Sequence, residues 1–224
     1  MAQHSHILAV IYDMDGVLTD SEALINAAAI AMFREMDLIV HPEDFLPFVG
    51  AGEDRYIGGV AEHYGFPLDM PVAKKRTYEI YLGLIPSQLK VFPGALELVQ
   101  SCREAGLLLA VASSADEIKV RANLAAIGLP VNFWDVVITG EDVKQKKPAP
   151  DIFLFTAKKL GLHPEECVVV EDAVNGVQAA KAAGMRCVAV TTTFPSDRLD
   201  EADVVRNSIA EVLLSELAPH LIED

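Results

Sequence analysis

The stretch IYDMDGVLTDSE, residues 11–22, places two carboxylates, Asp13 and Asp15, directly after an apolar run. In extended backbone, residues separated by one position project to the same side, so both carboxylates share one face. Burying an unpaired charge is expensive, and neighbouring carboxylates repel each other unless a cation lies among them. The pair therefore raises two questions: which cation offsets the two carboxylates, and which reaction they carry out.

Further polar side chains follow other apolar runs of the chain. They are Ser113 and Ser114 after residues 107–112, Lys147 in KQKKPAPD after residues 135–139, and Glu171 and Asp172 after residues 167–170. Carboxylate oxygens around open coordination positions suit Mg²⁺ holding a substrate phosphate. A nearby lysine and hydroxyls match a transferring phosphoryl group, whose spread negative charge needs several positive or donor partners. The residue types therefore predict phosphoryl transfer with Mg²⁺.

The elements that position these groups can be predicted from the apolar runs. The runs are ILAVIY, LLLAVA, DVVIT, CVVV and CVAVT, beginning at residues 7, 107, 135, 167 and 187. They are near-continuous rather than alternating, as in parallel strands covered on both faces, and amphipathic helical stretches lie between the later ones. We predict an α/β fold with a doubly wound, Rossmann-like parallel sheet, whose ligand crevice lies outside the carboxyl ends of the strands.

One connection is too long for a simple crossover. More than ninety residues separate the first two runs, although one helix and two short loops would suffice. Helical patterns fill this interval and predict an inserted small all-helical domain. We place the α/β core at residues 1–20 and 90–224 and the helical domain at residues 21–89.

The amino-acid composition limits the kinds of partner that the chain is expected to bind. The chain has 224 residues, 51% of them hydrophobic, and can bury a sizeable core. A formal net charge of −15 argues against nucleic acid and anionic membranes, whose phosphates need clustered Lys and Arg. Three scattered cysteines do not indicate a disulfide scaffold, and no apolar run reaches roughly 18 residues. We expect a monomer in the cytoplasm, or in the plastid stroma if a transit peptide has been removed, acting on a small phosphorylated metabolite.

Four stretches, DMDGVLTDSE, VASS, KKPAPD and VVVEDAVNG, resemble the four ordered motifs of the haloacid dehalogenase superfamily of hydrolases. The likeness covers nearly the whole chain, and the insertion resembles the helical cap of the β-phosphoglucomutase and phosphoglycolate phosphatase branch. The resemblance implies that Asp13 is a nucleophile forming an aspartyl phosphate. It implies that Asp15 is the general acid for the leaving oxygen and then the base that activates water.

The resemblance also assigns the remaining polar residues. Ser113 matches the hydroxyl that holds a phosphoryl oxygen, and Lys147 matches the ammonium that neutralises nucleophile and phosphate. Ser114 occupies a motif position as well, although a local turn would explain it equally. The metal-binding residues implied by the resemblance are Asp13, Asp15 through its backbone carbonyl, Asp172, and Glu171 nearby or through water.

The insertion departs from the pattern of the sugar phosphate mutases. Where these carry a histidine, the aligned position is Ile25, and the loop FVGAGEDR lacks their Lys-Gly pair followed by Arg. The missing Lys and Arg are the expected partners for a second phosphate, for which Arg55 could partly substitute. Hydrolysis is therefore favoured over a mutase cycle. The candidate substrate contacts are Gly50, Glu53, Arg55 and Tyr56.

The sequence thus predicts a Mg²⁺-dependent phosphatase for a small, sugar phosphate-like monoester, working through an aspartyl phosphate. A β-phosphoglucomutase-type mutase is one alternative, and a regulatory or binding module with weak catalysis is another. Dehalogenation is disfavoured because that reaction requires neither Asp15 nor Mg²⁺. A zinc site is also not indicated, because the histidines lack the spacing of zinc ligands.

Overall fold

A computed structural model describes residues 6–49 and 52–222 of the chain. Its centre is a six-stranded parallel sheet in the order β5-β4-β1-β6-β7-β8. The strands are β1 (Ala9–Tyr12), β4 (Leu108–Ala112), β5 (Val136–Ile138), β6 (Cys167–Glu171), β7 (Arg186–Val190) and β8 (Val204–Arg206). All five predicted apolar runs lie in this sheet, which confirms the doubly wound α/β fold.

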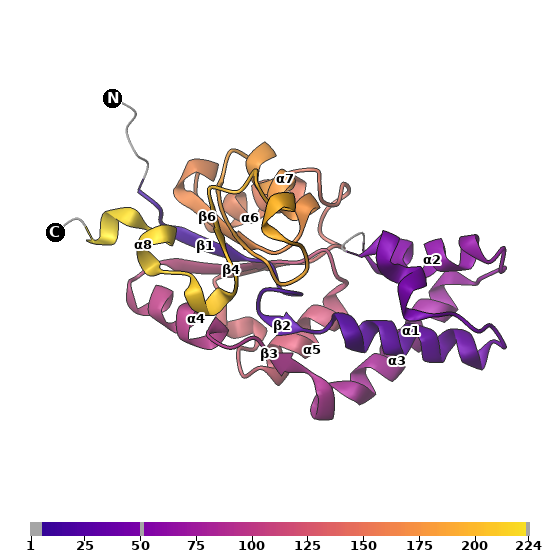
Figure 1. The fold of residues 1–224 in the computed structure, drawn as a ribbon. Helices are drawn as coiled ribbons and strands as arrows, with labels where there is room; N and C mark the ends of the chain where they lie inside the picture. Colours follow the sequence, from indigo (N-terminus) through magenta and orange to yellow (C-terminus); the bar gives the residue numbers. More distant parts are fainter. Residues whose placement is uncertain (1–5, 50–51, 223–224) are drawn as a thin grey trace.

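Helices cover both faces of the sheet (Figure 1). They are α4 (Ala95–Glu104), α5 (Glu117–Ala126), α6 (Asp151–Leu160), α7 (Val174–Ala182) and the short α8 (Leu214–Leu217). In β1, Val10 and Tyr12 pack on the side of α4 and α5, whereas Ala9 and Ile11 pack on the side of α6 and α7. Both sets of β1 side chains are buried, which explains why the run reads as continuously apolar.

The helical insertion comprises α1 (Glu22–Glu35), α2 (Glu53–His63) and α3 (Met70–Gln88), and it lies at the end of the molecule opposite α8 (Figure 1). It has an apolar core of its own that includes Phe33, Phe45, Ile57 and Tyr81. A two-stranded antiparallel pair, β2 (Thr19–Asp20) with β3 (Lys90–Val91), joins its entry to its exit. These features support a division near residues 20 and 90, which we retain as a proposal.

Short 3₁₀ helices complete the secondary structure. They are Pro42–Phe48, Val131–Phe133, Pro164–Glu166, Ser196–Arg198, Ile209–Glu211 and Pro219–Ile222. In the described part of the chain, no helix combines the length and apolar character that a membrane span requires.

The order of the strands places β1 between β4 and β6. The chain passes from β1 to β4 and β5 on one side, and then returns to β6, β7 and β8 on the other. Such a reversal opens a crevice at the carboxyl ends of the strands. The residues that follow β1, β4 and β6 therefore meet at one rim, beneath the helical insertion.

Candidate active site

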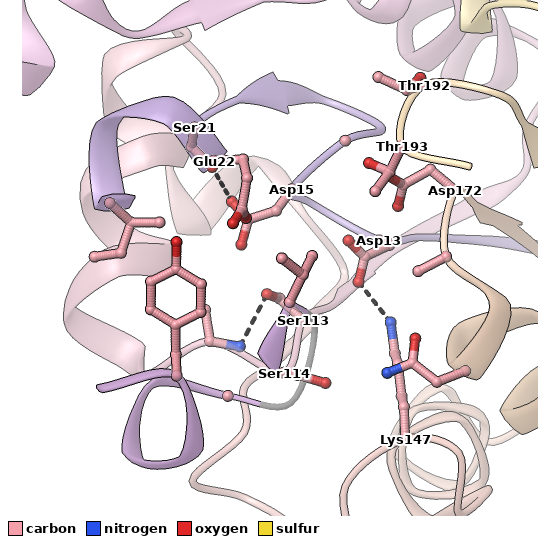
Figure 2. Close-up of a pocket in the computed structure, with 18 of the residues that line it drawn as sticks. Asp13, Asp15, Ser21, Glu22, Ser113, Ser114, Lys147, Asp172, Thr192 and Thr193 are labelled. Atoms are coloured by element: carbon pink, nitrogen blue, oxygen red, sulfur yellow. Dashed lines mark hydrogen bonds and ion pairs between the residues drawn. The ribbon is translucent and has the colours of Figure 1, made fainter. Parts of the chain in front are cut away.

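A cavity of about 330 Å³ lies at this rim, between the strand ends and helices α1 and α2. The structure brings together in it every residue predicted for catalysis, phosphate binding or metal binding. These are Asp13, Asp15, Ser113, Ser114, Lys147, Glu171 and Asp172. Figure 2 shows Asp13 between Asp15 on one side and Asp172 on the other, with Lys147 pointing at its carboxylate. The placement matches the predicted site, and the individual roles stay predictions.

Lys147 joins two buried carboxylates at the centre of the cavity. Its Nζ lies 2.5 Å from Asp13 Oδ1 and 2.7 Å from Glu171 Oε1. The other oxygen of Glu171, Oε2, accepts the backbone N–H groups of Asp172 and Ala173, each at 2.6 Å. Because both of its oxygens are engaged, Glu171 fixes the lysine beside Asp13.

The carboxylates of the site disfavour one another's ionisation. Burial raises the pKa of Asp13 to about 7, with Glu171 and Asp15 adding to the rise and Lys147 opposing it. Burial also holds the pKa of Asp172 well above its usual range, reinforced by Glu171 and Asp13. Three buried carboxylates thus lie near one ammonium, which pairs with two of them, and a further cation would stabilise the charged forms.

The donor set fits Mg²⁺ in its chemistry. In the described part of the chain no ion pair reaches Asp172, whose Oδ2 accepts a hydrogen bond from Thr193 Oγ1. There too, no group of three or more His, Cys, Asp or Glu side chains is arranged to hold an ion. Mg²⁺ commonly uses one or two carboxylates and completes its shell with water and substrate phosphate. Asp13, Asp172 and the Asp15 carbonyl supply oxygens of this kind.

Asp15 has a partner that the sequence reasoning did not identify. Its Oδ1 accepts from Ser21 Oγ, and its Oδ2 lies 2.8 Å from the Nζ of Lys119 in α5. Lys119 is 3% exposed and shares the buried face of α5 with Val120 and Asn123. Little in the sequence signals this contact, because the buried face of α5 carries polar Lys119 and Asn123 beside apolar residues.

The two serines after β4 present hydroxyls at the rim. The N–H of Ala115 donates to Ser113 Oγ at 3.2 Å. Ser114 Oγ is buried and has no hydrogen-bond partner among the residues that the structure describes. A buried hydroxyl without a partner is costly, and a phosphoryl oxygen in the cavity is an acceptor that could satisfy it.

Two of the four substrate contacts predicted in the insertion line the cavity. Glu53 and Tyr56 line the cavity on one face of α2, and Tyr56 Oη accepts from Asn26 Nδ2 at 3.0 Å. Glu22, which the sequence reasoning missed, also lines it, and burial raises the pKa of its carboxyl.

One of the other two predicted contacts, Arg55, does not line the cavity. Arg55 lies on the outer side of α2, half-exposed, where its Nη1 is 2.6 Å from Glu62 Oε2. Its guanidinium also stacks 4.9 Å from the centre of the Phe48 ring. The structure therefore does not bring Arg55 into the cavity, because residues 53 and 56 share a helix face that residue 55 does not, and its role as a substrate contact stays a prediction. Gly50 lies outside the described residues.

A parallel α/β sheet with this site beneath a helical insertion is the architecture of a capped hydrolase. The family model for haloacid dehalogenase-like hydrolases matches residues 7–184, and the chain belongs to that family. The resemblance seen in the four sequence motifs is thereby confirmed.

Three proteins illustrate how similar this chain is to known sequences and structures. Protein SUPPRESSOR OF QUENCHING 1, chloroplastic, from Arabidopsis thaliana is 48% identical over 218 residues, covering 94% of this chain but only 20% of that protein. Hexitol phosphatase A from Escherichia coli K12 is 32% identical over 206 residues, covering 92% of this chain and 93% of that protein. The crystal structure of CbbY from Rhodobacter sphaeroides in complex with phosphate has a TM-score of 0.86 at 29% identity, covering 94% of this chain and 99% of that one.

Proposed function

We propose that this chain is a Mg²⁺-dependent phosphatase that hydrolyses a small, sugar phosphate-like monoester through an aspartyl phosphate on Asp13. The observation that carries the proposal is the buried contact of Asp13 with Lys147 at 2.5 Å, in one cavity with Asp15. The relatives support the reaction class, since one is named a hexitol phosphatase and another was crystallised with phosphate.

The side chains allow a balanced two-step reaction. Asp13 attacks phosphorus, the bond from phosphorus to the leaving oxygen breaks, and Asp15 gives its proton to that oxygen. Asp15 then takes a proton from water, which attacks phosphorus and releases inorganic phosphate and Asp13. Lys147 and the hydroxyls of Ser113 and Ser114 are the donors for the charge that develops on the phosphoryl oxygens.

Asp13, Asp172 and the Asp15 carbonyl would hold the metal. When bound, Mg²⁺ supplies positive charge that offsets the carboxylates and polarises the phosphoryl group. Glu171 was predicted to bind the metal nearby or through water. Because both of its oxygens already accept hydrogen bonds, we propose that it mainly positions Lys147.

The mutase alternative is less well supported. Ile25 lines the cavity at the position where the mutases of this branch carry histidine. Over the residues that the structure describes, the helical insertion contributes neither Lys nor Arg to the cavity lining. A second phosphate would therefore meet carboxylates on that side. The second alternative, a regulatory or binding module with weak catalysis, is also less well supported. Such a module would have no need to keep a complete set of the proposed catalytic groups in one cavity, as this chain does with Asp13, Asp15, Lys147 and Asp172.

The remaining expectations are also kept as proposals. The plant relative is named as chloroplastic, which favours the plastid stroma over the cytoplasm. A monomeric state and the absence of nucleic-acid and membrane partners stay predictions.

Phosphate release from a panel of sugar and polyol monophosphates tests the proposal. We expect release with Mg²⁺, little release in EDTA, and loss of turnover in Asp13→Asn by at least about 10³-fold with the fold intact. Retained turnover in Asp13→Asn would contradict the nucleophile assignment. Conversion of a hexose 1-phosphate that depends on a bisphosphate, with little phosphate release, would favour the mutase.

A further inference from the structure

Lys119 is a buried cation shared by the core and the helical insertion. Its Nζ lies 2.8 Å from Asp15 Oδ2 in the core and 3.7 Å from Glu53 Oε1 at the start of α2. It also lies 5.8 Å from the centre of the Tyr81 ring of α3. The sheet side and the insertion side of the cavity therefore meet at one ammonium group.

Glu53 is the part of this arrangement that belongs to the insertion. Its side chain is 6% exposed, and its Oε2 has no hydrogen-bond partner within the described part of the chain. A buried carboxylate with one unsatisfied oxygen is costly unless a nearby charge offsets it. Among the described residues, Lys119 is the cation within ion-pair distance of Glu53, and it thereby links the start of α2 to the core.

A second ion pair joins the same two parts without touching the site. Lys74 of α3 lies 2.6 Å from Asp116, directly before α5, and 2.8 Å from Asp54 of α2. Lys74 does not line the cavity. Lys74 and Lys119 thus form two separate ion-pair links between the insertion and the segment of α5, and the link through Lys119 includes Asp15.

Building on the proposed function, we infer that Lys119 is a positioning residue that holds the Asp15 carboxylate for proton transfer while Glu53 is seated against the core. With α2 in place the ammonium is dry, and its hold on Asp15 is strong. With α2 withdrawn, water would reach the ammonium and weaken that hold. Proton transfer to the leaving group is thereby coupled to the presence of the insertion over the substrate.

The charge around Lys119 argues against a different role. Asp15 and Glu53 lie within ion-pair distance of its Nζ, and Glu22 also contributes to its electrostatic environment. An ammonium group shared among carboxylates of the protein has little remaining attraction for a second phosphate of a substrate. Its place in the site therefore favours positioning over substrate binding.

Leaving-group dependence of kcat/KM tests the inference. A hexitol phosphate needs its leaving oxygen protonated, whereas p-nitrophenyl phosphate does not. In Lys119→Met we expect kcat/KM for the hexitol phosphate to fall about tenfold or more relative to that for p-nitrophenyl phosphate. Because both values come from one protein sample, a partly unfolded fraction cancels from their ratio.

Three single variants and one double variant complete the test, with Lys74→Met as the control. Lys74→Met removes an ion pair between insertion and core that does not include Asp15, and it should leave the ratio of the two kcat/KM values unchanged. Lys119→Arg keeps the cation and should restore part of the ratio. Glu53→Gln should shift the ratio in the same direction as Lys119→Met, and the double variant should show less than the product of the two effects.

Two results would overturn the inference. One is an equal loss for both substrates in Lys119→Met, and the other is a selective rise in KM for bisphosphate esters, which would make Lys119 a substrate-binding group. Wild-type protein that releases phosphate from neither ester would contradict the proposed function itself, and the inference with it.

Discussion

At the scale of single residues, Gly16 and Asp172 show how closely the backbone after β1 approaches the predicted metal ligands. Gly16 has a φ of +83°, and a Cβ at this position would overlap the Asp172 carboxylate. A glycine here therefore serves two needs, since it allows a left-handed turn and leaves room for a carboxylate beside Asp13.

Gly16→Ala should displace the Asp172 carboxylate and raise the Mg²⁺ concentration for half-maximal phosphate release by about tenfold. A suitable control is Gly184→Ala, because Gly184 has a φ of +76° and no atom within 4 Å of its virtual Cβ. Both changes should cost about 1–2 kcal/mol of stability through backbone strain. Identical Mg²⁺ titrations of the two variants would contradict the placement of Asp172 in the metal site.

Some site residues could be predicted one by one and others could not. Asp13, Ser113 and Asp172 directly follow apolar strands, so the geometry of a parallel sheet places them at one rim. Lys119 could not be assigned, because its partner Asp15 lies 104 positions away and the contact depends on how α5 faces the site. The side of α2 on which Arg55 lies could not be predicted, because the sequence does not define how α2 is rotated relative to the cavity.

At the scale of elements, Asp203 ties three neighbouring segments together. Its carboxylate accepts the N–H of Cys187 in β7 at 2.7 Å, and Lys181 Nζ of α7 lies 2.7 Å away. Asp203 directly precedes β8, which the sequence reasoning missed because a strand of three half-buried residues forms no apolar run. Side-chain contacts of this kind hold β8 at the edge of the sheet, although its own residues do not predict a strand.

The pH dependence of stability should reveal this contact. Burial acts to raise the pKa of Asp203, but Lys181 and the Cys187 N–H outweigh it and lower the pKa below the usual range. A lowered folded-state pKa contributes stability above the unfolded value of about 4, and that contribution is lost as the pH falls through the folded-state pKa.

Asp203→Asn should therefore cost about 1–2 kcal/mol of unfolding free energy at pH 7. The difference from the wild-type protein should shrink as the pH falls below about 4. Urea denaturation of both proteins at a series of pH values measures this. A difference that stays constant down to pH values of about 3 would show that the ionised carboxylate is not responsible.

At the scale of the whole molecule, the strand ends supply the proposed reacting groups and the helical insertion lines the other side of the cavity. The α/β core and the presence of an insertion follow from strand periodicity and from the length of one connection. The contacts between them, such as Tyr81 Oη donating to Asn123 Oδ1 at 2.7 Å, depend on the packing of α3 on α5. Sequence patterns define which elements form, but not how two separately packed cores meet.

The most direct test of the central claim is detection of the covalent intermediate on Asp13. Asp15→Asn should form the aspartyl phosphate from p-nitrophenyl phosphate but hydrolyse it slowly, so that the intermediate accumulates. After quenching in acid with a labelled phosphoryl group, we expect the label on the peptide that contains Asp13, with none in the Asp13→Asn, Asp15→Asn double variant. Steady release of nitrophenol by Asp15→Asn beyond one equivalent of enzyme, without label on that peptide, would contradict a nucleophilic role for Asp13.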